Sequence, residues 1–142
     1  MTIKYPEVSV CGLSCRLCPR YHSRGQKRCG GRKSEYRMST GCHFITCAVK
    51  RKRIESCGEC PELNECEKWS KHRDYSLHHD TIVCYQKLED SVSIIQKTGI
   101  ESFDDDQQHR GSLLRQMLEE FNEGRSKNYF CISATAFEID EI

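Results

Sequence analysis

The placement of cysteine constrains this chain more than any other feature. The chain has 142 residues, and nine of its eleven cysteines lie before position 67. The nine are Cys11, Cys15, Cys18, Cys29, Cys42, Cys47, Cys57, Cys60 and Cys66. Residues 19–41 are rich in Gly, Ser and Arg and poor in apolar side chains, so they cannot bury enough apolar surface to order themselves. We therefore expect the cysteines to hold the first half of the chain together.

The sequence favours free thiols over disulfides. The opening stretch, MTIKYPEVSV, has no apolar run that could act as a signal peptide, and no later stretch could cross a membrane. We therefore expect a cytoplasmic protein. In that reducing compartment, closely spaced cysteines are more often metal ligands or redox groups than structural bridges, and an odd total fits a full disulfide set poorly.

Two C-x2-C pairs, Cys15/Cys18 and Cys57/Cys60, predict metal binding. Such a pair delivers two of the four tetrahedral ligands of zinc from one turn of the chain. With all nine cysteines as candidate ligands, the sequence has enough for two zinc ions. Closed four-thiolate sites leave no position open for water or substrate, so we expect the zinc to be structural.

The pairing of ligands with ions stays open at this point. One arrangement gives one ion the ligands Cys11, Cys15, Cys18 and Cys29, and gives a second ion four of Cys42, Cys47, Cys57, Cys60 and Cys66. An interleaved arrangement fits the same spacings. In a regular helix, Cys42 and Cys47 would point to different sides, so they can share an ion only if Cys42 precedes the helix. His43 and His22 are weaker candidate ligands.

The spacing of Cys11, Cys15 and Cys18 is also that of the cluster loop of radical S-adenosylmethionine enzymes. Those enzymes need a large α/β barrel, and a chain this short without strand–helix alternation argues against one. A plain iron–sulfur protein is the stronger alternative to zinc, because thiolates bind clusters as readily and Cys18-Pro19 matches the end of ferredoxin loops.

Hydrophobic periodicity predicts a mainly α fold, in which an irregular cysteine-rich module (1–71) packs on a C-terminal helical bundle (72–142). The expected helices are 42–53, 61–73, 80–98, 105–123 and a last one after residue 126. Pro61 is suited to the first helical position, and Gly99 to a helix end. Asp80 is expected to cap the helix 80–98, and Ser126 to cap the last helix. For the helix 105–123, we expect its start at Asp104, Asp105 and Asp106, where the helix dipole favours negative charge, and its end at Gly124.

The remaining cysteines, Cys84 and Cys131, lie in apolar helical stretches and are expected in the core. No arrangement of nucleophile, base and orienting group marks an active site, so we expect no catalytic residue. A binding or interaction module is the function class that the sequence favours over an enzyme.

Charge is distributed unevenly. Residues 1–60 hold 13 Lys or Arg and 4 Asp or Glu, whereas residues 61–142 hold 9 and 17. The basic half could bind nucleic acid or another polyanion, attract the acidic half, or compensate the charge of metal-bound thiolates. The basic run KRKR (50–53) could likewise bind the phosphates of a nucleic acid or neutralise the charge of nearby thiolates. The expected partner is a protein or a nucleic acid.

Three stretches resemble a known family. CGLSCRLCP, RCGG and CHFITCAVKRKRIESCGECPELNECEKW, within residues 9–71, are similar to the pattern of the domain of unknown function 3795, found in small prokaryotic proteins. The family usually has a second cysteine where this chain has Gly31 or Arg32. The resemblance implies a cytosolic zinc-binding protein and supplies no reaction.

Overall fold

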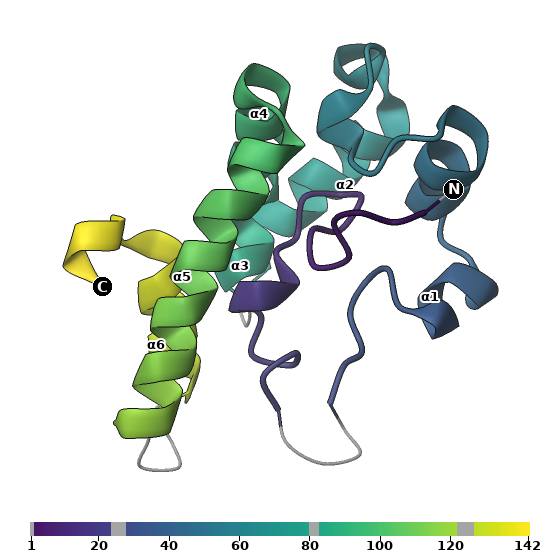
Figure 1. Ribbon diagram of the computed structural model, residues 1–142. Coiled ribbons are helices and arrows are strands. Elements are labelled where there is room, and N and C mark those ends of the chain that lie inside the picture. Colours follow the sequence, from purple (N-terminus) through teal and green to yellow (C-terminus); the bar gives the residue numbers. More distant parts are fainter. Residues whose placement is uncertain (1, 24–27, 80–82, 122–126) are drawn as a thin grey trace.

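The computed structural model describes residues 2–23, 28–79, 83–121 and 127–142, and these residues are mainly helical (Figure 1). Within these ranges the chain forms no named strand, and its one isolated β-bridge pairs Val8 with Ser14. The mainly α prediction is therefore confirmed. The α/β barrel of a radical S-adenosylmethionine enzyme has no counterpart in the described ranges.

Six α-helices account for about half of the described residues. They are α1 (Glu35–Thr40), α2 (Glu67–Leu77), α3 (Val83–Gln86), α4 (Leu88–Thr98), α5 (Ile100–Glu120) and α6 (Lys127–Ala136). The described ranges also contain one π-helix and four short 3-10 turns. These are η1 (Cys15–Leu17), η2 (Ile45–Lys52, the π-helix), η3 (Cys57–Glu59), η4 (Leu63–Glu65) and η5 (Ile139–Glu141).

The helix boundaries in the second half correct the sequence prediction. Gly99, with φ at 93°, ends α4, and α5 begins at the next residue rather than near 105. Asp104, Asp105 and Asp106 therefore lie inside α5, so their predicted place at its start is wrong. The periodic stretch 80–98 is confirmed from Val83 onward, although it is interrupted at Lys87. The predicted roles of Asp80, Gly124 and Ser126 lie outside the described residues.

The helix predicted for 61–73 begins later than expected. Successive 3-10 hydrogen bonds join Cys60 N–H to the Cys57 carbonyl (3.1 Å), Leu63 to Cys60 (3.3 Å) and Cys66 to Leu63 (3.1 Å). These turns hold the backbone out of α-helical geometry, so α2 starts at Glu67 instead of Pro61. Cys66 caps the helix, because its sulfur accepts the Trp69 N–H at 3.4 Å.

The helix predicted for 42–53 is present, but most of it, Ile45–Lys52, has the wider i→i+5 turn of a π-helix. It ends at Arg53, the one non-glycine residue with positive φ in the described ranges. π-Helical turns often mark functional sites. Here the π-helix carries Cys47 beside the cavity described below.

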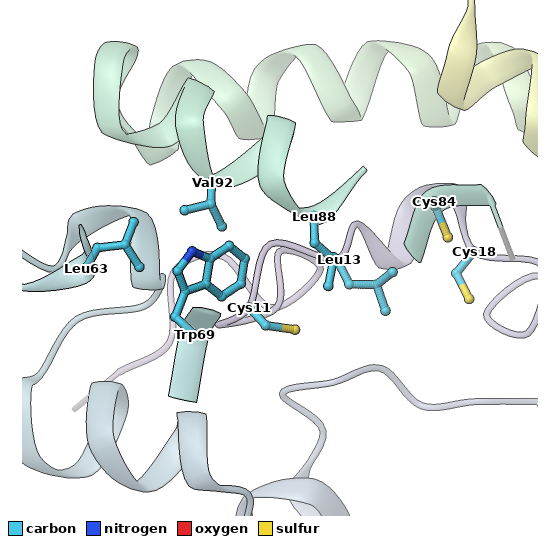
Figure 2. Packing of buried hydrophobic residues seen from close by; sticks show 8 residues of the cluster. All are labelled: Cys11, Leu13, Cys18, Leu63, Trp69, Cys84, Leu88 and Val92. Carbon is cyan, nitrogen blue, oxygen red and sulfur yellow. The ribbon is translucent and has the colours of Figure 1, made fainter. Parts of the chain in front are cut away.

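The largest hydrophobic cluster joins the two halves of the chain (Figure 2). It contains Cys11, Leu13, Cys18, Leu63 and Trp69 from the first half and Cys84, Leu88 and Val92 from the second. The turn η1 packs on α5 and α6, and η3 packs on α4. The expected regions 1–71 and 72–142 thus share one core.

Helix α4 is the surface on which both cysteine segments rest. A Cβ atom on Gly12 would lie 2.8 Å from Val92 Cγ2, and one on Gly58 would lie 2.6 Å from Ile95 Cγ2. Only glycine allows the two turns to approach the helix this closely. The glycines of the CGLSC and CGEC stretches therefore position the neighbouring sulfur atoms.

Candidate metal centre

Four of the predicted ligands line one cavity of about 330 Å³. Cys47 comes from η2, Cys57 and Cys60 border the turn η3, and Cys66 stands at the start of α2. These four are one of the sets that the sequence left open. Cys42 is exposed and is not among the residues lining this cavity.

Burial and the neighbouring cysteines both oppose deprotonation of the Cys57 thiol. Burial raises the pKa of the Cys57 thiol, and the nearby Cys11, Cys66, Cys60 and Cys47 raise it further. A buried thiolate among other thiolates requires a compensating positive charge. A divalent cation between the sulfur atoms would supply it.

Two hydrogen bonds reach sulfur atoms of this set. Lys52 Nζ donates to Cys60 Sγ at 3.2 Å and to a Glu62 carboxylate oxygen at 2.6 Å. The Trp69 backbone N–H donates to Cys66 Sγ. Within the run KRKR, Lys52 is therefore paired with a thiol and a carboxylate and is not free to bind a phosphate.

A second set gathers around η1. Burial raises the pKa of Cys15 to about 11, the backbone N–H of Arg32 opposes the rise, and nearby Cys18 and Cys29 add to it. Cys11 lies near both sets: its Sγ is 3.3 Å from Ser9 Oγ, and its proximity raises the pKa of Cys57 and of Arg32.

Cys84 contacts this second set, which sequence reasoning missed. A hydrogen bond from Cys84 lowers the pKa of Cys18 to about 6, burial opposes it, and the Arg20 and Tyr21 backbone N–H groups lower it further. The same bond raises the pKa of Cys84. Cys84 is buried, as predicted, but it also faces another thiol. A local pattern could not show this contact, because it joins distant segments.

The Arg32 side chain provides a cation beside the second set. Its guanidinium lies 5.6 Å from the Tyr85 ring centroid and interacts with the charges of Cys11, Cys15 and Cys18. The positive charge of Arg32 acts against the rise in the pKa of Cys15 that burial causes. Each set therefore has a basic side chain beside its sulfur atoms, Lys52 at the first set and Arg32 at the second.

The cysteine side chains of the two sets lie near one another, but they do not surround a common point at which an ion could bind. Within the described residues, no group of three or more His, Cys, Asp or Glu side chains is arranged so that it could hold a metal ion. All eleven cysteines are free thiols. His43 is exposed at the first cavity. The His22 ring hydrogen-bonds the Arg16 carbonyl of η1.

No protein-family model, no curated protein and no solved structure matches the chain. The resemblance to the domain of unknown function 3795 therefore stays a prediction. Nowhere in the described ranges is a helix both long and apolar enough to span a membrane.

Proposed function

We propose that this protein binds zinc through Cys47, Cys57, Cys60 and Cys66 and that the ion is structural. The supporting observation is that these four thiols, from η2, η3 and the start of α2, line one cavity. Zinc prefers four thiolates in a tetrahedron, and the C-x2-C turn supplies two of them. The proposal requires the thiols to rearrange when the ion binds, since they do not close around a common point without it.

The residues around the cavity fit this role. The buried Cys57 lacks a compensating charge, while Cys60 and Cys66 receive donors from Lys52 and the Trp69 backbone. Such outer hydrogen bonds orient metal ligands and tune their basicity. When bound, the ion would tie η2, η3 and α2 together and add to the apolar contacts that Ile45, Leu63 and Trp69 already make.

The biological role we propose is a cytoplasmic interaction module rather than an enzyme. Four sulfur ligands leave no open coordination position, so the centre would hold shape without performing chemistry. Large aromatic side chains on the surface, Tyr36 (71% exposed) and Tyr75 (62% exposed), are of the type enriched at protein interfaces.

A protein partner is favoured over a nucleic acid because much of the basic charge is already used internally. Arg16 pairs with Glu7 and Asp104, and Lys33 pairs with Glu55. Arg32 and Lys52 lie against thiols. Salt-dependent retention of DNA or RNA by the purified protein would contradict this choice.

Elemental analysis of protein purified without oxygen tests the zinc site. We expect about one zinc per chain in the wild type, and loss of it in Cys60→Ser. The matched control is Cys42→Ser, which removes an exposed cysteine outside the cavity and should keep the metal. Iron with visible absorbance would assign the thiols to an iron–sulfur cluster instead, and equal zinc content in both variants would reject this ligand set.

A further inference from the structure

A cavity without cysteine lies where η1 and the chain after it meet α5. Its volume is about 150 Å³. Three arginines line it, together with an acidic side chain and two aromatic rings: Arg16, Arg28 and Arg115, with Glu7, Tyr21 and His22. None of these residues belongs to the ligand set proposed for zinc, so the cavity is a separate feature of the molecule.

Arg16 is held in place by contacts on two sides. Its side chain packs on α5, where a Cβ atom added to Gly111 would lie 3.2 Å from Arg16 Cβ. Its guanidinium lies 3.1 Å from a Glu7 carboxylate oxygen and 3.6 Å from Asp104. Arg16 Nε is buried and has no hydrogen-bond partner among the described residues. Buried donors are nearly always paired, so a further acceptor is expected beside Arg16.

The other two arginines carry positive charge without an acidic partner. Neither Arg28 nor Arg115 forms an ion pair with another described residue. Arg28 Nε donates to the Tyr21 carbonyl oxygen at 3.0 Å, and its guanidinium lies 5.1 Å from the Tyr21 ring centroid. Arg115 is exposed and lies one helical turn after Gly111, on the same face of α5. Two unpaired guanidiniums from separate parts of the chain therefore border one cavity.

Hydrogen bonds fix the backbone next to Tyr21 and Arg28. The Tyr21 N–H donates to the Cys18 carbonyl oxygen at 3.1 Å, and the Cys29 N–H donates to the Arg20 carbonyl oxygen at 3.1 Å. Donors that are already in place lose less conformational entropy when a ligand binds. The cavity is therefore partly organised before it meets a ligand.

We propose that this cavity binds the phosphate group of a small phosphomonoester. Guanidinium groups match phosphate oxygens in geometry and keep their charge at physiological pH. A phosphomonoester has three terminal oxygens and a charge of about −1.5 to −2 at neutral pH, so it can accept from Arg28 and Arg115 together. A carboxylate has two oxygens and one charge, which a single arginine can satisfy.

The size of the cavity sets how much of the ligand it encloses. Pockets that enclose a drug-sized molecule measure about 300–1,000 Å³. At about 150 Å³, this cavity has room for one charged group, and the rest of the molecule would lie outside. We therefore expect recognition of the phosphate group itself, with little selection for what it is attached to.

Isothermal titration calorimetry of the full chain tests the proposal, with methyl phosphate as the probe. We expect saturable binding at low ionic strength that weakens as sodium chloride is added. Dimethyl phosphate is the matched diester with a single charge, and it should bind about tenfold more weakly because hydrogen bonds strengthen with charge. Acetate should be weaker than methyl phosphate for the same reason.

Two variants locate the binding. Arg115→Gln and Arg28→Gln should each weaken methyl phosphate binding about tenfold, because each removes a charged donor. The matched control is Arg20→Gln, which removes an exposed arginine that does not line the cavity and should keep the affinity. Circular dichroism and zinc content should be the same in all three variants as in the wild type. A loss of phosphate binding with zinc retained therefore assigns the effect to this cavity and leaves the zinc proposal intact.

Three results would overturn the inference. The first is no saturable binding of methyl phosphate at millimolar concentration, by calorimetry or by phosphorus NMR. The second is equal affinity for dimethyl phosphate, which would favour a nucleic-acid backbone as the ligand. The third is an equal loss in Arg115→Gln and Arg20→Gln, which would assign the binding to general surface charge.

Discussion

The backbone N–H of Cys57 donates to the carbonyl oxygen of Val10 at 2.7 Å, which joins the two cysteine segments directly. The bond places the CGLSC stretch beside the CGEC stretch, and both rest on α4 through Gly12 and Gly58. The proximity of Cys11 to Cys57 follows from this arrangement. The packing of these turns therefore sets where the cysteines of both segments lie.

Gly58→Ala should destabilise the protein by about 1–3 kcal/mol, because the new Cβ would lie 2.6 Å from Ile95 Cγ2 and 3.0 Å from the Val92 carbonyl oxygen. The turn would have to move off α4, and Cys57 and Cys60 with it. Urea unfolding measures the change. Gly30→Ala is the control, since its Cβ would meet Ser34 Cβ at an ordinary 3.4 Å. Equal stability of both variants would show that the turn does not pack as described.

The buried ion pair between Lys33 and Glu55 should be costly to break. Lys33 Nζ lies 3.0 Å from Glu55 Oε1, with the side chains 0% and 7% exposed. Removing one partner leaves a buried charge, so Lys33→Met or Glu55→Gln should each cost about 3 kcal/mol of unfolding free energy. The double variant should cost less than the sum of the two. Strict additivity would indicate that the pair is not formed.

The same pair predicts a pH dependence. Burial tends to raise the pKa of Glu55, but hydrogen bonds from the Tyr5 and Lys4 backbone and from Lys33 lower it overall. A lowered folded-state pKa stabilises the protein above the ordinary glutamate pKa, and this stability is lost as pH falls through the folded-state value. The stability difference between wild type and Glu55→Gln should therefore shrink in acid. A difference that grows as the pH falls would contradict this assignment.

Arg53→Gly should stabilise the protein by about 1 kcal/mol. Arg53 ends η2 with φ at 55° and ψ at 40°, a left-handed conformation that favours glycine over residues with a Cβ. The control is Arg51→Gly inside η2, where glycine should cost about 1 kcal/mol. Thermal unfolding followed by circular dichroism compares the two. Opposite signs support the left-handed helix end, and a loss of stability in both rejects it.

Metal removal should loosen one part of the molecule selectively. In a chelator, amide hydrogen exchange should rise over residues 45–66, which the proposed zinc site holds together. Helices α5 and α6 should stay protected, because Leu114 and Ala134 are 0% exposed within a separate apolar cluster. Exchange rates that do not change with chelator would remove the structural role of the metal.

The sequence by itself determined the local features of this protein. The helical periodicity of the second half predicted helices that α4, α5 and α6 confirm, since side chains three and four positions apart share a helix face. Gly99 was correctly predicted to end a helix, because its positive φ suits glycine. The sparse apolar content indicated why cysteines crowd the first half.

Tertiary structure decided which residues meet. The π-helix, the chain of 3-10 turns and the packing on α4 brought Cys47, Cys57, Cys60 and Cys66 to one cavity and left Cys42 exposed. They also placed α3 so that Cys84 faces Cys18. Spacing along a chain fixes only neighbours within a turn or two, whereas contacts between distant segments depend on how whole elements pack.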